Sequence, residues 1–299
     1  MIPLAENLQK PKNFIQEFNE ITQRVLNYIP DVLNDETKFG GYIICSSSIA
    51  GTKKSIRPFR DDLFLRSSKT FEKDFKRFES IIKSIKCGNR NFNKDDYHIV
   101  DSVVYTIQQS MGIGLDLMVQ SNSARKHVGN RFEELIRTLF SDMGISLKKV
   151  VLKIPYETED GEKYYRCETD IIISPFKKVK SDSKTIHANE IVISLKTTTK
   201  DRMPKIFIDK VLMEKFVGHP VKVVGISQND IQRKDSGNET KISYTFVSNL
   251  FMVYTKFLAQ LEGYYYLDTP AKALEKPFNQ HIFPFSKLVI DDIWNMLSS

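Results

Sequence analysis

The pattern of apolar positions predicts a mostly helical first part of the chain. Between residues 13 and 33, apolar side chains recur at three- and four-residue spacings, which is the period of an amphipathic helix. Two further helices are predicted within residues 70–86 and 95–113. A basic, polar loop is expected before them, around residues 51–62. The spacing therefore predicts a helical N-terminal region.

From residue 121 onwards the pattern changes, and helices alternate with strands. Short runs rich in β-branched and aromatic residues, separated by charged or turn-forming segments, are typical of strands. The helix expected after them has Pro204 in its first turn and Gly218 at its C-terminal end, where these residues are favoured. This order predicts an α/β (α+β) fold with a mixed central β-sheet flanked by helices. The predicted elements are a helix at 126–145, strands within 147–156, 164–176 and 189–199, a helix at 203–218 and a strand at 221–227.

The last part of the chain is predicted to extend this core. A strand and a helix are expected between residues 241 and 263, and the apolar tail 281–297 is expected to pack back onto the body. The Tyr264–Tyr266 run is interpreted as core, because aromatic clusters are more often buried than exposed. The predicted domains are a helical N-terminal region, residues 1–120, and an α/β core with a C-terminal extension, residues 121–299.

The composition shows that the chain is basic, and it excludes few classes of partner. Of the 299 residues, 41% are hydrophobic and 27% are charged, and no apolar run is long enough to suggest a membrane span. The N-terminus lacks the pattern of a secretory signal. The cysteines, Cys45, Cys87 and Cys167, have no zinc-type spacing and suggest reduced thiols in a cytoplasmic protein. The net charge of +7 suits a polyanionic partner such as nucleic acid, although many basic proteins bind none.

An acid and a lysine stand at the ends of two predicted strands. Asp170 heads the run DIII, and Lys196 ends the run EIVISLK. The strand period places Ser194 on the same face as Lys196, with Ile193 and Leu195 on the other face. At neighbouring strand ends, a carboxylate can bind Mg²⁺ and an ammonium group can orient water for hydrolysis. The alternative is a pair of solvated charges that flank buried strands.

Asp170 and the run that ends at Lys196 resemble the signature of the PD-(D/E)xK nuclease superfamily. The acid usually found two positions before the lysine is replaced here by Ser194. The same departure is typical of type II restriction endonucleases that read CCGG or CC-N-GG type sites, in which the following helix supplies the missing acid. The resemblance assigns that role to Asp209, thirteen positions after Lys196, with Glu214 as the fallback. The alternative for Asp209 is an ordinary surface carboxylate on a helix.

The loop after this lysine, TTTKDR, resembles the run that precedes the acidic helix in the same restriction endonucleases. There the last three residues read a C·G step in the major groove, which implies that role for Lys200, Asp201 and Arg202. The chemistry is suitable, because Arg or Lys donates to guanine O6 and N7 while a carboxylate accepts from cytosine N4. The alternative is a charged turn at the start of a helix.

The run VGNRFEELI resembles the Gly-x-x-Phe-Glu helix that often supplies a further carboxylate in this superfamily. The apolar stripe of the helix places Glu133 about 90° from its centre, at the border of a cleft, taking about 100° per residue. Glu134 is expected to point away from the stripe into solvent. Glu133 is therefore the candidate third acid, in contact with the metal or close to it.

The resemblance implies a Mg²⁺-dependent type II restriction endonuclease that cuts double-stranded DNA at a palindrome containing CC/GG and leaves 5′-phosphates. Asp170, Asp209 and Glu133 would hold the metal, Lys196 would position water, and Ser194 would support the site. A homodimer or homotetramer is expected, because a palindrome needs two copies of each reading loop. A cognate DNA methyltransferase is expected in the host.

Two alternatives from other classes stay open. One is a PD-(D/E)xK nuclease of DNA repair or recombination that cuts without site specificity. The other is a non-catalytic DNA-binding protein, for which the positive charge alone would suffice. Residues 1–120 are interpreted as scaffold, with dimerisation or DNA contact as the alternatives.

Overall fold

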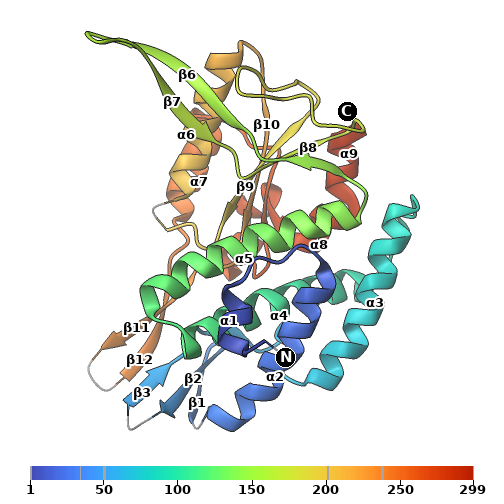
Figure 1. Ribbon diagram of the computed structural model, residues 1–299, viewed down its shortest axis with the longest axis vertical. Helices are drawn as coiled ribbons and strands as arrows, with labels where there is room; N and C mark the ends of the chain where they lie inside the picture. Colours follow the sequence, from blue (N-terminus) through green and yellow to red (C-terminus); the bar gives the residue numbers. More distant parts are fainter. Residues whose placement is uncertain (1, 34, 50–51, 201, 237–238, 299) are drawn as a thin grey trace.

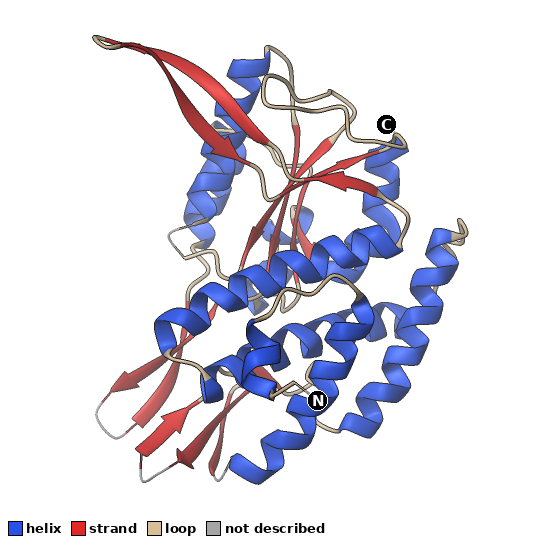
Figure 2. Cartoon of the chain, in the orientation of Figure 1, coloured by secondary structure: helices blue, strands red, loops and turns tan. Residues whose placement is uncertain are grey.

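The computed structural model describes residues 2–33, 35–49, 52–200, 202–236 and 239–298. In the view of Figure 1, a twisted sheet with helices beside it forms the upper part of the molecule. Helices from the first part of the chain gather below it, with small strands at the lower left, and Figure 2 distinguishes helices and strands by colour. None of the helices in these ranges is long and apolar enough to cross a membrane.

The first part of the chain is a layer of helices with a small antiparallel sheet. Its helices are α1 (Leu4–Gln9), α2 (Ile15–Val32), α3 (Ser68–Lys86) and α4 (Lys94–Met118), and its strands are β1 (Asp35–Phe39), β2 (Tyr42–Ile49), β3 (Thr52–Ser55) and β4 (Phe59–Arg60). The apolar faces of the predicted helices meet in one core. In the sheet, β2 pairs with each of the other three strands.

The prediction of a loop around residues 51–62 is wrong in part, because this range contains two strands. Both β3 and β4 pair with β2. The sequence of β3 is TKKS, which has no apolar alternation for a sequence pattern to detect. Pairing with β2, the strand directly before it in the chain, therefore decides its conformation rather than local propensity.

The second part is built on a six-stranded mixed sheet, as the sequence predicts. In spatial order its strands are β14 (Ile282–Pro284), β13 (Gly263–Tyr266), β10 (Lys222–Ser227), β9 (Ile191–Lys196), β8 (Ile171–Ser174) and β5 (Ser146–Lys148). The strands from β14 to β9 are parallel, whereas β8 and β5 are antiparallel to their neighbours. Parallel neighbours need crossover connections, so helices must cover the sheet.

Helices lie on both faces of this sheet (Figure 1). They are α5 (Ser121–Asp142) on one face and α6 (Met203–Val217) with α7 (Ser248–Phe257) on the other. Successive side chains of a strand point to opposite faces. Along β9, Ile193 and Leu195 belong to the core under α5, whereas Val192 belongs to the core under α6. The alternation turns Ser194 and Lys196 toward α6, in agreement with the strand period.

Two hairpins leave the sheet. β6 (Val151–Thr158) and β7 (Gly161–Glu168) form a ribbon that projects at the upper left of Figure 1. β11 (Ile231–Ser236) and β12 (Glu239–Tyr244) lie beside the small N-terminal sheet. There the rings of Tyr42 and Tyr244 meet edge to face with centroids 6.4 Å apart. The second hairpin therefore connects the two parts of the chain.

The C-terminal segment packs back onto the body, as predicted. Ile290 and Ile293 are fully buried, and the guanidinium of Arg90 lies 3.9 Å from the ring centroid of Trp294. The Tyr264–Tyr266 run lies in β13 and is buried, which confirms its interpretation as core. The short helices of this segment are η1 (Ala271–Leu274), η2 (Phe278–Gln280), α8 (Phe285–Lys287), η3 (Leu288–Asp292) and α9 (Ile293–Ser298).

Gly225 allows β10 to approach β13 closely, beside the end of β9. A Cβ atom at this position would lie 2.6 Å from Cε2 of Tyr264, so the ring or the strand would have to shift. Gly225 is also the register partner of Ser194. We expect Gly225→Ala to lower the free energy of unfolding by about 1–3 kcal/mol through overpacking, measured by urea unfolding.

Gly129 in α5 is the matched control, because a Cβ atom there meets nothing within 4 Å. Gly129→Ala should raise the free energy of unfolding by roughly 0.5–1 kcal/mol, since alanine loses less backbone entropy in a helix. Equal effects of the two substitutions would contradict the close approach at Gly225.

Candidate active site

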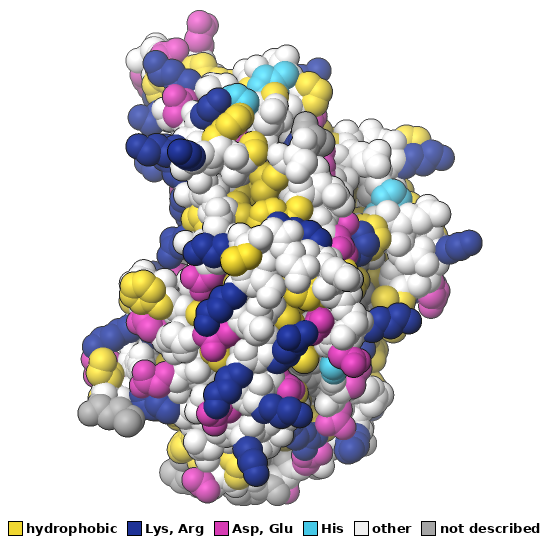
Figure 3. Space-filling view, turned by 90° about the vertical axis from the view of Figure 1, so that its right-hand side faces the viewer, with side chains coloured by type: hydrophobic (Ala, Val, Ile, Leu, Met, Phe, Trp, Pro, Cys, Tyr) yellow, Lys and Arg dark blue, Asp and Glu magenta, His cyan; other side chains and the backbone are white. Residues whose placement is uncertain are grey.

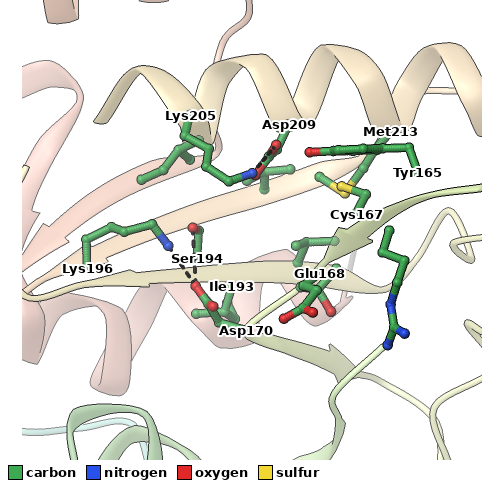
Figure 4. A pocket seen from close by; sticks show the side chains of 15 residues that line it. Tyr165, Cys167, Glu168, Asp170, Ile193, Ser194, Lys196, Lys205, Asp209 and Met213 are labelled. Carbon is green, nitrogen blue, oxygen red and sulfur yellow. Dashed lines mark hydrogen bonds and ion pairs between the residues drawn. The ribbon is translucent and has the colours of Figure 1, made fainter. Parts of the chain in front are cut away.

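A cavity of about 330 Å³ opens between the sheet and α6 and contains several of the predicted site residues (Figure 4). Asp170, Ser194 and Lys196 line it from the strand ends. Lys205 and Asp209 line it from α6, and β7 forms a further wall. The cavity therefore brings together the two strand ends and the helix that carry the predicted site residues.

Asp170 and Lys196 form the centre of this cavity. The Nζ atom of Lys196 lies 2.9 Å from Oδ2 of Asp170 and donates a second hydrogen bond to the Leu195 carbonyl oxygen at 2.9 Å. The side chain of Lys196 is 14% exposed and that of Asp170 is 20% exposed. An ion pair that is partly shielded from water interacts more strongly than the same pair on an open surface. The pair is thus held in place while one side stays accessible.

The end of the pairing between β8 and β9 explains why Asp170 reaches this position. The ladder ends at the Ile171–Ile193 pair, so β8 does not pair with the Leu195 N–H further along β9. The Asp170 carboxylate takes that place and accepts the hydrogen bond from Leu195 N at 2.7 Å. A buried N–H without an acceptor is destabilising. This bond therefore stabilises the strand end and also fixes the position of the Asp170 carboxylate.

Ser194 lies beside the pair and contacts it weakly. Its Oγ atom is 3.5 Å from Oδ2 of Asp170, and Figure 4 shows the hydroxyl facing the carboxylate. A separation of 3.5 Å is at the limit of a hydrogen bond. The contacts from Ser194, Leu195 and Lys196 all reach Oδ2, and Oδ1 accepts none of them.

Asp209 enters the cavity from α6, as the resemblance implies, but its carboxylate is paired with a lysine. Its Oδ1 and Oδ2 atoms accept from Nζ of Lys205 at 2.7 and 2.6 Å. Residues four apart face each other on a helix, which accounts for the pair. The Lys205 side chain is 55% exposed, so the pair adds little stability and can open.

The fallback acid, Glu214, lies nearer the other end of α6. Its Oε1 accepts from the backbone N–H of Val221 at 3.1 Å and lies 3.7 Å from Nζ of Lys210. Among the described residues that line the cavity, Asp209 is present and Glu214 is not. The geometry therefore favours Asp209 as the second acid.

Glu133 on α5 lies close enough to the centre to interact with its charges. Burial raises the pKa of Glu133, the negative charge of Asp170 raises it further, and positive charges including Lys196 oppose the rise. Two neighbouring carboxylates disfavour each other's ionised form, and a cation bound between them relieves that repulsion. The position of Glu133 is therefore compatible with its predicted role near a metal.

The expectation that Glu134 points into solvent is wrong. Its Oε2 atom accepts from the backbone N–H of Lys12, and its Oε1 atom accepts from Arg131, both at 2.7 Å. Glu134 is only 9% exposed. The segment between α1 and α2 covers this side of α5, so a face that the helical period assigns to solvent is buried by residues distant in sequence. Periodicity alone cannot detect such a contact.

The predicted reading loop follows β9 directly and is anchored at Thr199. The N–H and the hydroxyl of Thr199 donate to Oδ1 of Asp230 at 2.8 and 2.5 Å. Lys200 and Arg202, beyond this anchor, are exposed. Asp201 lies outside the described residues. The ends of the loop are thus positioned beside the cavity with two of its three predicted reading residues accessible.

The sequence interpretation missed Glu168, a further carboxylate that lines the cavity. It ends β7, two residues before Asp170, and Figure 4 shows both carboxylates in the lower part of the site. Residues two apart in an extended chain share a face, so the spacing was an available signal. Lys205 was also missed, although its four-residue spacing from Asp209 predicts their contact.

The donor set suits Mg²⁺. This ion prefers carboxylate oxygens and is usually held by one or two of them, with water and substrate phosphate as the remaining ligands. In the described part of the chain, no three His, Cys, Asp or Glu side chains form a ready metal cluster. Asp170 with Glu133 or Asp209 supplies the smaller number of carboxylates that Mg²⁺ needs.

This arrangement of sheet and flanking helices is a restriction-endonuclease-like fold. The chain is similar to the crystal structure of the type IIP restriction endonuclease Kpn2I, with a TM-score of 0.71 and 18% identity over 95% of this chain and 91% of that chain. A complex of the restriction endonuclease PspGI with substrate DNA aligns over 77% of this chain and 92% of that chain, with a TM-score of 0.43 and 14% identity. No protein-family model and no curated protein matches the sequence. The likeness to Kpn2I confirms the predicted fold.

Glu133 is expected to have opposite effects on stability and on metal affinity. Because its pKa is raised, the folded protein holds this proton more tightly than the unfolded chain does, and stability falls as pH rises through that range. Glu133→Gln removes the buried charge and should raise the melting temperature at neutral pH without metal. It should also weaken Mg²⁺ binding by about 10-fold or more, measured by calorimetry.

Glu134→Gln is the matched control at the adjacent position. It weakens the acceptor of the buried Arg131, so it should lower the melting temperature and leave Mg²⁺ affinity unchanged. An unchanged Mg²⁺ affinity in Glu133→Gln would remove that residue from the metal site.

Proposed function

We propose that this chain is a Mg²⁺-dependent type II restriction endonuclease, which hydrolyses phosphodiesters of double-stranded DNA at a specific site. The observation that carries the proposal is the contact of Asp170 with Lys196, 2.9 Å between Oδ2 and Nζ, in a cavity at the strand ends of this fold. An ion pair alone would mean little. Here Asp209 of α6 lines the same cavity, and Glu133 of α5, which does not line it, interacts electrostatically with Asp170. A loop with exposed basic residues begins at the same strand end.

In the proposed reaction, the oxygen of water attacks the phosphorus atom and the bond to the 3′ oxygen breaks. The water gives up a proton to solvent and the leaving oxygen takes one up, which leaves a 5′-phosphate and a 3′-hydroxyl. Asp170, Asp209 and Glu133 would hold Mg²⁺, which supplies Lewis-acid stabilisation of the phosphate charge when bound. Nζ of Lys196, fixed by its two hydrogen bonds, orients the water and stabilises the negative charge of the transition state. The hydroxyl of Ser194 supports the carboxylate of Asp170.

Lys205 must release Asp209 before this acid can contribute. The two carboxylate oxygens that accept from Lys205 are the atoms a metal would need. Since the side chain of Lys205 is more than half exposed, it can turn toward a DNA phosphate when a metal ion binds Asp209. The contact of Lys205 with Asp209 therefore competes with metal binding at Asp209.

Sequence reading is assigned to Lys200, Asp201 and Arg202, at a palindrome that contains CC/GG. A palindrome needs two copies of the loop, so the proposed assembly is a homodimer or homotetramer. A cognate DNA methyltransferase would protect the sites of the host, and the enzyme would act in the cytoplasm. The predicted division at residue 120 is kept in this proposal, with residues 1–120 as a scaffold and residues 121–299 as the catalytic core.

The distribution of surface charge argues against DNA binding on one part of the surface. In the lower part of the face that Figure 3 shows, Lys and Arg side chains are interspersed with Asp and Glu. A DNA-binding surface gathers basic side chains of one sign over the path of the phosphates. That part of the surface therefore lacks the expected footprint, although the chain carries a net charge of +7.

Lys196→Ala tests the proposed chemistry. We expect it to abolish cleavage and spare DNA binding, a rate loss of at least about 10³-fold, or about 4 kcal/mol, because the group that orients water is removed. Purified protein is incubated with Mg²⁺ and mixed genomic DNA, and the ends produced are sequenced. Lys215→Ala, at an exposed lysine of α6 outside the cavity, is the control and should cut like the wild type.

Fragments that share one palindrome would support the proposal and reveal the recognition site. Random ends would indicate a repair-type nuclease, and no ends from the wild type would favour a non-catalytic DNA-binding protein. Cleavage by Lys196→Ala at a near wild-type rate would refute the assignment of the site.

Arg202→Ala tests the assignment of the loop. The loss of a bidentate contact to guanine should weaken binding to the recognised site by roughly 1–3 kcal/mol, or about 5- to 150-fold. Binding to unrelated DNA should fall much less, and both affinities are measured by titration of labelled duplexes. Equal weakening on both kinds of DNA would assign Arg202 to a phosphate contact instead.

A further inference from the structure

A buried carboxylate outside the cavity, Asp230, joins the reading loop to the sheet. It lies in the short connection between β10 and β11 and is 2% exposed. Oδ1 accepts from Thr199 as described above, and Oδ2 accepts from the hydroxyl of Tyr266 in β13 at 2.5 Å. We infer that Asp230 is a positioning residue for sequence reading, because it fixes Thr199, the residue directly before Lys200. This inference rests on the proposed function.

Further neutral donors complete the surroundings of Asp230. Oδ1 also accepts from the hydroxyls of Thr198, at 3.4 Å, and Thr245, at 3.2 Å. The carbonyl oxygen of Asp230 accepts from the Thr245 N–H at 2.9 Å, which closes the base of the β11–β12 hairpin. One carboxylate therefore connects the loop, the hairpin and β13.

A purely structural role does not explain a carboxylate at this place. Burial raises the pKa of Asp230, and the hydrogen bonds from Thr199 and Tyr266 oppose that rise. The donors named above are all neutral, so hydrogen bonds alone compensate for the lost hydration of the carboxylate. Apolar residues of similar volume often stabilise a core as well or better. A carboxylate differs from an apolar side chain because its lone pairs accept directed hydrogen bonds. They fix both the N–H and the hydroxyl of Thr199 at the start of the loop.

The same connection also holds the catalytic lysine. The N–H of Gln228 donates to the Lys196 carbonyl oxygen at 3.0 Å, and Ser227 is the register partner of Lys196. Residues 227–230 thus fix Lys196 and Thr199, three positions apart along the chain. A loosened contact to Thr199 should disturb reading first, because Lys196 keeps its own contacts to Asp170 and Gln228.

Two tyrosines of β13 form a matched pair for the test. The hydroxyl of Tyr266 donates to Asp230, whereas that of Tyr264 is 2.7 Å from the hydroxyl of Ser227 and does not reach the loop. Both side chains are 1% exposed, and both belong to the core under α6. Tyr266→Phe and Tyr264→Phe therefore each remove one buried hydroxyl, but only the first removes a contact to Asp230.

The variants are made in the Lys196→Ala background, so that the DNA is not cut, and are bound to a pool of duplexes of random sequence with Mg²⁺. The retained DNA is sequenced, and the melting temperature of each protein is measured. Tyr266→Phe should lower enrichment of the recognised palindrome over unrelated duplexes by about 10-fold, as expected for losing a hydrogen bond to a charged group. Tyr264→Phe should change it by less than about 3-fold at a similar loss of thermal stability. Asp230→Asn should lower enrichment at least as much as Tyr266→Phe.

Unchanged enrichment in Tyr266→Phe, or an equal loss in both tyrosine variants, would overturn the positioning role of Asp230 and leave the proposed function intact. If the parent protein itself enriches no palindrome, the proposed function fails and the positioning role fails with it. The parent protein thus separates the two failures.

Discussion

The hydrogen bond from the Leu195 N–H to Asp170 is the interaction on which the geometry of the site depends. It exists because the ladder between β8 and β9 ends at the Ile171–Ile193 pair, two residues before Leu195. A carboxylate that replaces a strand partner is held in one position, since its movement would leave a buried N–H without an acceptor. The ammonium group of Lys196 then docks on the same oxygen atom. The reactive groups are therefore positioned by the backbone of the sheet rather than by a flexible loop.

Buried polar contacts extend from this site toward the N-terminal part. Asp268 follows β13 closely, and its Oδ1 accepts from Arg60 at 3.0 Å and from the hydroxyl of Tyr42 at 3.2 Å. Burial raises the pKa of Asp268 to about 6, and Arg60 opposes the rise. The carboxylate thus braces the end of the strand that carries Tyr266. Arg60 and Tyr42 of the N-terminal part thus contact the segment that follows β13, the strand whose Tyr266 binds Asp230. These contacts support the proposed role of residues 1–120 as a scaffold.

Much of the fold follows from periodicity, whereas contacts between distant residues do not. The alternation along β9 correctly separates Ser194 from Ile193, and the helices of both parts are recognisable from apolar spacing. The burial of Glu134 by a segment more than a hundred residues earlier has no local signal in the sequence. The strand β3 pairs with β2 just before it, but its sequence, TKKS, has no apolar alternation that would predict a strand.

The site shows the same division. The acid, the lysine and their helix partners could be named from spacing and resemblance, and Glu168 and Lys205 could have been added from the strand and helix periods. Asp230 could not, because its partners in the loop and in β13 lie 31 and 36 residues away. A buried aspartate after a strand looks like an ordinary turn residue in the sequence. Only the fold connects it to Thr199.

The metal dependence of cleavage by the Asp170 centre tests the central claim most directly. Protein freed of metal with EDTA is incubated with supercoiled plasmid DNA while Mg²⁺ is titrated back, and Asp170→Asn serves as the near-isosteric variant. The account predicts that discrete cleavage by the wild type returns with Mg²⁺ and that Asp170→Asn does not cut at any Mg²⁺ concentration. Cleavage without Mg²⁺, or cleavage by Asp170→Asn at the wild-type rate, would contradict it.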